Sequence, residues 1–570
     1  MSDNKKPAMR PMVAWYDPRQ LARTGVEVAV STIFGRHSDY RITEALVPPD
    51  ENDDVFGDEA GAPPDADGIY DYSLGQTMWL DYISDTGDGW DSTYSVAYYA
   101  SQPQLIVAGH DKPMPRGAVL VFGGDEVYPT ASRQVYRDRL IDPFESALSR
   151  TESPNPHVFA IPGNHDWYDS LVSFTRLFCS RRWFGGWQTR QSRSYFALKL
   201  PQRWWLIGTD VQLDSDIDIP QVRYFKRIAK RMNDGDRIIL CTAEPHWIYA
   251  KIYGKDDQNY SEDNLAFLEN KIFCNQQVAV YLSGDLHHYR RHATDAGLQK
   301  ITAGGGGAFL HPTHGEDVTE LADGYRLKKA FPPLNESKKL TWRNFGFLFM
   351  NPWFGFVPAL LYTLTCWSVM ADLSKYKSIT DTWLAMGEAV SKAITNPMAV
   401  FWILLVWGGF LMFTDVHSKR YRIIAGTLHG LTHVLAVFFI GWFATYVSVK
   451  LSLDWFHKGF FTPHQLLIAA VIIFVLGWIV GSIVMGVYLF ISLNIFKRHS
   501  NEAFSALACP DWKNFLRLRI DAQGGLTIFP IGIRRVARKW KTTGASDGPG
   551  YVSDDSKATP PELIEQPISI

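Results

Sequence analysis

Five short clusters of acidic, amide and imidazole side chains occur in the first half of the sequence. They are Asp85-Thr86-Gly87-Asp88, Gly123-Gly124-Asp125, Gly163-Asn164-His165-Asp166, Glu244-Pro245-His246-Trp247 and Gly284-Asp285-Leu286-His287-His288. Carboxylate, amide and imidazole groups hold divalent cations in proteins, and two such cations can clamp the attacking and leaving oxygens of a phosphate ester. The clusters therefore predict a two-metal site for phosphate ester cleavage.

The residue types also indicate individual roles. Asp125 is the candidate for the carboxylate that bridges both cations, and Asn164 offers a neutral oxygen ligand. His165 stands beside Asn164, where an imidazole can stabilise the transition state or protonate the leaving oxygen. Asp166 is placed to orient that imidazole. We therefore predict His165 and Asp166 as the catalytic residues.

Each cluster follows a short apolar run that predicts a buried strand. These runs are Met78–Ser84, Ala118–Phe122, His157–Ile161, Arg237–Thr242 and Val278–Ser283, and Trp204–Gly208 is a further one. Longer amphipathic stretches, such as Gln134–Leu148 and Gln221–Met232, alternate with them and predict helices. This alternation indicates an α/β domain, in which polar residues at strand ends build the site.

The order and spacing of these clusters resemble the calcineurin-like metallophosphoesterases, a group that includes the purple acid phosphatases. The resemblance covers Met78 to His314, and Gly163-Asn164-His165-Asp166 is its most specific motif. It implies a double β-sheet sandwich flanked by helices and two bound metal ions. The implied reaction is hydrolysis of phosphate monoesters, diesters or pyrophosphates.

The sequence departs from the family pattern in two motifs. Gly87 stands where the first motif usually has histidine, and Asp285 stands where the last motif has its first histidine. His287 and Tyr289 fit the tyrosine-containing variant found in purple acid phosphatases. The departures are compatible with a site richer in carboxylate than usual or with a degenerate, inactive domain.

Two alignments fit the fourth motif. Aligning Trp247 puts Glu244 on the usual histidine, whereas aligning by residue type selects His246, which we prefer. Because carboxylate oxygens suit harder ions, we expect manganese, iron or magnesium rather than zinc. The implied metal ligands are Asp85, Asp125, Asn164, Glu244 or His246, Asp285 and His287.

Further polar residues near the motifs are candidates for contacts to the ligands or the substrate. Asp88 and His288 adjoin the first and last motifs. The glycine run Gly304–Gly307 precedes His311 and His314, and glycine backbone N–H groups can approach an anion closely. The alternative is a flexible turn with surface histidines.

Four long segments lack Asp, Glu, Lys and Arg: Phe345–Met370, Ala393–Thr414, Ile423–Val449 and Gln465–Phe496. Each is long enough to cross a hydrocarbon layer of about 30 Å as a helix. Lys and Arg are more frequent in the loops on one side, so we expect the N-terminal domain and the C-terminus to face the cytosol. The chain is thus predicted to be a multi-pass protein of a plasma or inner membrane.

The expected domain organisation follows from these changes in composition. The third apolar segment also carries His429 and His433 on one helix face, either as a metal or phosphate site or as neutral histidines. The predicted parts are an N-terminal extension with an acidic linker (1–77), a metallophosphoesterase domain (78–344), four transmembrane helices (345–496), a C-terminal cytosolic segment with a β-hairpin (497–541) and a disordered tail (542–570).

The composition excludes several other classes. A net charge of −2 and the lack of a basic face in the motif region argue against nucleic acid as a partner. The five cysteines are scattered without a Cys-x-x-Cys pair, which argues against a disulfide framework or a thiolate zinc site.

We therefore predict a membrane-anchored, metal-dependent phosphoesterase. Its expected partners are the membrane and a phosphorylated substrate, for which a lipid-linked phosphate is one option because tethering raises local concentration at the bilayer. The alternative is a membrane sensor or transport-like protein whose phosphoesterase-like domain binds a nucleotide without cleaving it.

Overall fold

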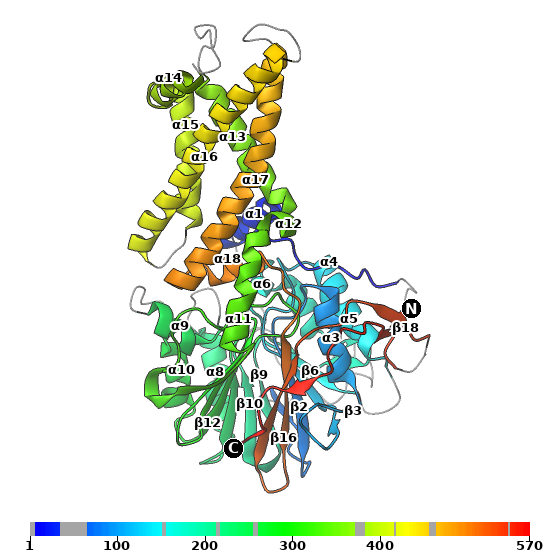
Figure 1. Ribbon diagram of the computed structural model, residues 1–570. Helices are drawn as coiled ribbons and strands as arrows, with labels where there is room; N and C mark the ends of the chain where they lie inside the picture. The colour runs from blue at the N-terminus through cyan, green and yellow to red at the C-terminus, as the bar shows by residue number, and fades with distance from the viewer. Residues whose placement is uncertain are drawn as a thin grey trace. The chain divides into compact units, whose positions relative to one another are not determined.

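The computed structural model in Figure 1 describes residues 6–34, 65, 67–150, 155–211, 217–254, 260–370, 382–414, 418–454, 463–544 and 548–570. The chain forms two compact units. The first comprises Met1–Val13, Arg23–Ser337 and Ala508–Ile570, and the second comprises Ala14–Ala22 and Lys338–Leu507. Much of the predicted N-terminal extension with its acidic linker (1–77) lies outside the described residues, at 1–5, 35–64 and 66.

Two large mixed sheets form the first unit. In spatial order, one contains β1 (Ile69–Asp71), β9 (Phe196–Lys199), β10 (Trp204–Gly208), β11 (Arg237–Cys241), β12 (Gln277–Ser283), β14 (Gln299–Ala303), β13 (Tyr289–Ala293) and β15 (Arg326–Phe331). The other contains β20 (Glu562–Leu563), β17 (Leu526–Ile533), β16 (Lys513–Ile520), β2 (Met78–Ile83), β5 (Val119–Phe122), β6 (His157–Ala160), β8 (Trp187–Thr189) and β7 (Trp183–Phe184), with β21 (Ile568–Ser569) pairing β17. Short ladders also join β3 (Gln104–Leu105) to β4 (Met114–Pro115) and β18 (Trp540–Thr542) to β19 (Tyr551–Ser553).

The two sheets pack face to face because their strands alternate in side-chain direction. Leu80 and Tyr82 of β2 join Ile239 of β11 and Leu282 of β12 in one buried core between the sheets. Ile83, on the opposite face of β2, belongs to a second core beneath the helices. The α/β sandwich predicted from the sequence is therefore confirmed, and the six predicted strands correspond to β2, β5, β6, β10, β11 and β12.

Helices cover the outer face of each sheet. The second core packs α3 (Trp90–Ser101), α5 (Asp142–Ala147) and α7 (Val172–Phe178) on the sheet that contains β2. A third core packs α8 (Ile219–Ala229), α9 (His246–Tyr253) and α10 (Asp263–Phe267) on the other sheet. Among the described residues, the other α-helices that lie wholly within this unit are α4 (Arg133–Tyr136) and α6 (Asn164–Trp167), while α1 (Pro18–Phe34) crosses the unit boundary.

The C-terminal residues complete the first unit. The predicted hairpin is the antiparallel pair β16 and β17, and β16 also pairs with β2 in the middle of the sheet. Arg517 of β16 forms a bidentate ion pair with Asp81 of β2, at 2.7 and 3.0 Å, and both side chains are buried. The predicted domain 78–344 is therefore incomplete, because its sheet also needs residues 508–570.

The predicted disordered tail from residue 542 is wrong for the described residues 548–570. The strands β20 and β21 pair with β17, and β19 pairs with β18. Ile564 and Ile568 enter the core between the sheets, which provides the burial that orders this polar segment.

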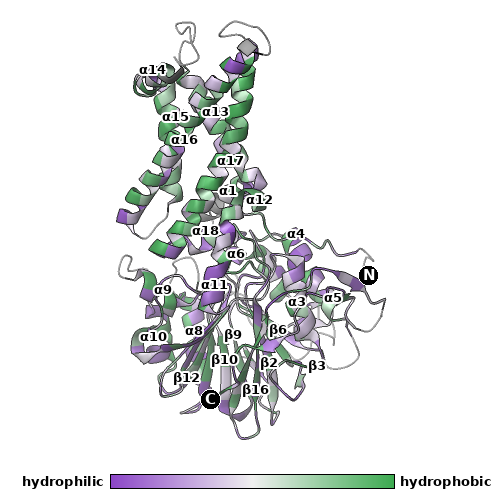
Figure 2. Cartoon of the chain, in the orientation of Figure 1, coloured by the Kyte–Doolittle hydropathy of each residue, from purple (hydrophilic) through white to green (hydrophobic). Residues whose placement is uncertain are grey.

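The second unit is helical, and Figure 2 shows that its long helices are predominantly hydrophobic. Two single helices are long and apolar enough to cross a membrane, Lys419–Ser452 within α16 (Lys419–Asp454) and α17 (Pro463–Phe496). The other helices are α11 (Leu334–Leu340, across the unit boundary), α12 (Phe347–Met350), α13 (Phe356–Ser368), α14 (Thr382–Thr395), α15 (Pro397–Phe413) and α18 (Ser500–Ser505).

The first two predicted spans are not straight helices. Leu334–Met350 and Pro352–Ser368 meet at 61°, and Leu384–Thr395 and Pro397–Phe413 meet at 84°. Both breaks precede a proline, which disfavours helical backbone at the residue before it. The described residues thus contain two candidate membrane spans, or up to four if each bent pair counts as one.

Candidate metal centre

Three predicted ligands converge on the hydroxyl of Tyr128. This hydroxyl lies 3.0 Å from Asp85 Oδ1, 3.1 Å from Asp125 Oδ2 and 2.9 Å from His287 Nε2. Asp85 follows β2, Asp125 follows β5 and His287 follows β12, so both sheets contribute to one point. All four side chains are buried.

Three acceptors at this point compete for the hydrogen of the Tyr128 hydroxyl. His287 Nδ1 lies 2.8 Å from the carbonyl oxygen of Phe309 and donates to it, so in the neutral ring Nε2 is an acceptor. Burial holds the pKa of His287 well below its usual value, which keeps the ring neutral. The single hydrogen of Tyr128 therefore faces two carboxylates and one imidazole lone pair, an arrangement that a cation would satisfy.

The backbone turns sharply at each aspartate. Asp85, Asp125 and Asp285 have φ values of 58°, 52° and 64°, in the left-handed region that few non-glycine residues adopt. This conformation lets the Asp285 N–H group donate to Asp85 Oδ1 and Oδ2, at 3.0 and 2.9 Å. The Tyr249 hydroxyl donates to Asp285 Oδ2. Strained backbone of this kind is concentrated at functional sites.

Burial and mutual repulsion raise the pKa values of the three aspartates. Burial raises the pKa of Asp125 to about 7. Burial, and then repulsion from Asp125, raises the pKa of Asp85 well above its ordinary value. The pKa of Asp285 is raised by burial and then by repulsion from Glu244, Asp125 and Asp85. Within the described residues, no lysine or arginine forms an ion pair with these three carboxyl groups.

The donor set therefore suits divalent cations in its chemistry. Among the residues that the structure describes, however, no three His, Cys, Asp or Glu side chains are arranged as a ready-made metal site. The Tyr128 hydroxyl lies between Asp85, Asp125 and His287 and supplies a fourth donor atom of a different type.

The Gly163–Asp166 turn places His165 beside this centre. Its backbone N–H donates to Asp125 Oδ1 at 2.9 Å, and its ring centroid lies 4.4 Å from that of Tyr128. Its Nδ1 donates to the Pro129 carbonyl oxygen at 2.6 Å, and burial lowers its pKa to about 4. The neutral ring thus carries its proton on Nδ1 and offers a lone pair at Nε2.

Asp166 acts on His165 through its charge, which raises the pKa of that ring against the lowering effect of burial. His165 Nδ1 donates to the Pro129 carbonyl oxygen, and this hydrogen bond orients the ring. Asp166 Oδ2 accepts from the Gly163 and Glu126 N–H groups at 2.9 and 3.2 Å. Asp166 Oδ1 accepts from the Tyr136 hydroxyl at 2.5 Å. Its carboxylate therefore holds the turn together.

The two alternatives of the fourth motif differ in their electrostatic surroundings. Glu244 raises the pKa values of both Asp285 and Tyr168 by repulsion, so its carboxyl group lies near the centre. His246 begins α9, and burial alone lowers its pKa to about 4. The Nε2 atom of His246 is buried without a hydrogen-bond partner among the described residues, so Glu244 and His246 both stay candidate ligands. Asn164, the first residue of α6, donates to the Tyr168 hydroxyl at 3.1 Å.

The residues predicted around the ligands lie in different environments. Asp88 accepts from the Val13 and Phe309 N–H groups at 2.7 and 3.1 Å. The ring of His311 stacks on His287 with centroids 3.8 Å apart. His288 is buried, and His314 Nδ1 is 2.8 Å from Ser337 Oγ.

Two N–H groups of the Gly304–Gly307 run are engaged within the protein. The N–H groups of Gly304 and Gly306 donate to the carbonyl oxygens of His288 and Ser84 at 3.1 and 2.8 Å. A Cβ atom at Gly304 would lie 2.5 Å from Asp85 Oδ2. Glycine is needed here because this buried loop packs directly on the Asp85 turn.

Sequence reasoning missed two residues at the centre. Tyr128 follows Asp125 by three positions, so the pattern Gly-Asp-x-x-Tyr was a local signal for it. Lys513 is buried at the start of β16, and its Nζ donates to the Ala308 carbonyl oxygen. Burial lowers the pKa of Lys513 to about 8, against the opposing effect of nearby acidic groups that include Asp88 and Asp85. Nothing local in the sequence connects Lys513 to the motifs.

Residues 78–289 match the family model of the calcineurin-like phosphoesterases. The chain therefore contains a calcineurin-like metallophosphoesterase domain, as its motifs predicted. Among curated proteins, none matches the chain.

Three solved structures resemble part of the chain. GAP50, the anchor in the inner membrane complex of Plasmodium, is 14% identical with a TM-score of 0.31, and the match covers 44% of this chain and 78% of the GAP50 chain. The purple acid phosphatase PPD1 from yellow lupin (Lupinus luteus) seeds is 13% identical with a TM-score of 0.29, and the match covers 41% of this chain and 45% of the PPD1 chain. PhoD is 11% identical with a TM-score of 0.26, and the match covers 41% of this chain and 58% of the PhoD chain.

Proposed function

We propose that this protein is a metal-dependent phosphoesterase whose helical unit anchors it in a membrane. The observation that carries the proposal is the convergence of Asp85, Asp125 and His287 on the single hydroxyl of Tyr128. Buried carboxyl groups held this close together repel one another, and a bound cation would neutralise them. The family match at residues 78–289 supports phosphate esters as the substrate class.

We assign the ligands to two groups around Asp125. Asp85, Tyr128 and His287 would hold one cation, and Asn164, Glu244 and Asp285 would hold the other, with Asp125 shared between them. When bound, two divalent cations supply Lewis-acid activation of water and neutralise charge on the phosphate oxygens. Because most of these donors are oxygens, manganese, iron or magnesium is expected in preference to zinc.

Other residues of the chain position this centre. The Pro129 carbonyl oxygen holds the proton of His165 on Nδ1, so that Nε2 can accept a hydrogen bond from water or from a protonated substrate oxygen. Asp166 holds the turn that carries Asn164 and His165. The Phe309 carbonyl oxygen accepts from His287 Nδ1 and so fixes the ring with Nε2 directed at Tyr128, because a hydrogen bond to one ring nitrogen orients the other toward a metal.

The membrane placement is part of the same proposal. Lys and Arg are concentrated in the segments on the side of the N-terminal domain, so we propose that this domain and the C-terminus face the cytosol. A phosphorylated substrate that is itself in the membrane, such as a lipid-linked phosphate, would gain from the tether.

The test uses the full chain in detergent, because a fragment that ends at Asn344 would lack β16 and β17. The protein is stripped with a chelator, reloaded with manganese, iron, magnesium or zinc, and assayed with p-nitrophenyl phosphate and bis-p-nitrophenyl phosphate. We expect turnover that requires added metal and falls at least about 100-fold in Asp125→Asn. Asp295→Asn is the matched control, since Asp295 is 80% exposed on a loop.

Two outcomes would reject the proposal. Turnover that is unchanged in Asp125→Asn would place the chemistry elsewhere. No turnover on either ester, with stoichiometric metal or nucleotide still bound, would instead favour a sensor or transport-like protein with a non-catalytic domain.

A further inference from the structure

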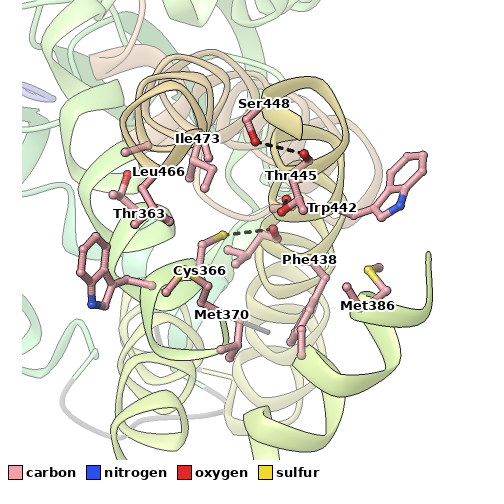
Figure 3. A pocket seen from close by; sticks show the side chains of 18 of the residues that line it. Thr363, Cys366, Met370, Met386, Phe438, Trp442, Thr445, Ser448, Leu466 and Ile473 are labelled. Carbon is pink, nitrogen blue, oxygen red and sulfur yellow. Dashed lines mark hydrogen bonds between the residues drawn. The ribbon is translucent and has the colours of Figure 1, made fainter. Parts of the chain in front are cut away.

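A cavity of about 100 Å³ lies within the second unit, between α13, α14, α16 and α17. Figure 3 shows Cys366, Met370, Phe438 and Ile473 among the side chains that line it. The cavity belongs to this unit alone and is separate from the candidate metal centre, whose described residues are all in the first unit.

The wall of the cavity is chemically apolar. Among the described residues that line it, none is Asp, Glu, Lys, Arg or His. The hydroxyls of Thr363 and Thr445 donate to carbonyl oxygens of their own helices, both at 2.8 Å, and Ser448 Oγ donates to the Thr445 carbonyl oxygen at 3.0 Å. These hydroxyl groups are thus satisfied within their helices, so apart from Gln465, which also lines the cavity, the wall offers little to a charged or strongly polar ligand.

Small residues create the space. Ala385 and Ala389 of α14 face the cavity together with Gly441 of α16 and Ala469 of α17. A Cβ atom at Gly441 would lie 3.0 Å from Cys366 Sγ, so the helices approach closely at the edge of the cavity. A site for one water molecule needs roughly 10–15 Å³ on a comparable scale, so this cavity has room for a short run of hydrocarbon.

The inference rests on the proposed membrane placement, in which lipid surrounds these helices and identifies the occupant. Among the described residues, α16 and α17 are the two single helices that are long and apolar enough to cross a membrane. Next to the cavity, Leu467 and Val471 of α17 expose 66% and 54% of their surface, as side chains in contact with lipid do. A large apolar cavity stays dry, so lipid hydrocarbon is the component of that medium that can fill it.

Gln465 lies in the first turn of α17 and lines the same cavity. Met370, which also lines the cavity, lies just beyond the end of α13. The positions of Gln465 and Met370 show that the cavity lies at one end of the helical unit. We propose that this cavity holds one hydrocarbon tail of a membrane lipid, which enters at this end of the helices. The proposal assigns the helical unit a lipid-binding role beyond anchoring.

The test uses the full chain reconstituted in phosphatidylcholine vesicles that contain a phospholipid with a photoreactive diazirine near the end of one acyl chain. After irradiation, peptides are analysed by mass spectrometry. We expect adducts on cavity residues such as Cys366 and Phe438 as well as on Leu467 and Val471, which are exposed. Ala469→Phe should reduce the cavity adducts at least fivefold and leave those on Leu467 and Val471 unchanged.

Controls separate filling of the cavity from general damage. Gly408→Leu adds volume on α15, where nothing lies within 4 Å of a new Cβ atom, and should leave all adducts unchanged. Ala389→Leu fills the cavity from α14 and gives an independent variant if Ala469→Phe does not fold. The proposal is overturned if cavity residues are not labelled while Leu467 and Val471 are, or if folded filling variants keep the cavity adducts.

Discussion

The ion pair between Arg517 and Asp81 provides a quantitative test of how the C-terminal residues contribute to the first unit. Arg517 is fully buried and donates to Asp81 at 2.7 and 3.0 Å and to the Met114 and Ala100 carbonyl oxygens at 3.0 Å each. In Arg517→Met, the buried Asp81 would lose its countercharge. Breaking a buried pair in this way costs about 3–5 kcal/mol.

A loss of this size is a large part of the stability of an ordinary domain, which is about 5–15 kcal/mol. At about 2 °C per kcal/mol for a large domain, the unfolding midpoint of the first unit should fall by about 6–10 °C. Differential scanning fluorimetry of the full chain in detergent measures this shift. Arg519→Met is the matched control, because Arg519 lies on the same strand and is exposed, and its midpoint should change by about 1 °C or less.

The double variant Asp81→Leu/Arg517→Met separates charge from packing. Without either charge, most of the loss should be recovered, because replacing a buried pair by apolar groups is often close to neutral. The reasoning is refuted if Arg517→Met unfolds at the same temperature as the unchanged chain. It is equally refuted if the double variant is no more stable than the single one.

Three further predictions concern the candidate metal centre. Tyr128→Phe should lower both bound metal, measured by mass spectrometry of the stripped and reloaded protein, and turnover by at least tenfold, because an oxygen donor is lost. Gly304→Ala should lower turnover at least tenfold by displacing the Asp85 carboxyl group, whereas Gly315→Ala, with nothing within 4 Å of its Cβ, should not. Glu244→Gln should reduce turnover more than a substitution of His246 by Asn; equal effects would count against the assignment of Glu244.

Much of the centre could be predicted from the sequence because its parts are local. Asp85, Asp125 and His287 each lie within a few residues of the end of an apolar strand, and parallel strands such as β2 and β5 bring such ends to one edge of a sheet. The strands themselves follow from short apolar runs that end in turn-forming residues. Five strand-end motifs in the right order were therefore sufficient for the fold and the family.

The predicted membrane region shows the limit of composition. The length and hydropathy of residues 423–449 and 465–496 correctly placed α16 and α17. The same criteria did not reveal the breaks before Pro352 and Pro397, because hydropathy averages over a segment and carries no information on backbone direction.

Only the tertiary structure decided which distant residues complete the domain. Arg517 and Lys513 return to the first unit after the whole helical unit, and a charged residue in a strand reads as exposed until its partner is known. The contact of Pro129 with His165 and the single hydroxyl of Tyr128 among three acceptors depend on angles and distances that no local pattern encodes. The sequence determined which groups stand at the strand ends, and three-dimensional packing decided which atoms meet, because hydrogen bonding and burial act between residues that are far apart in the chain.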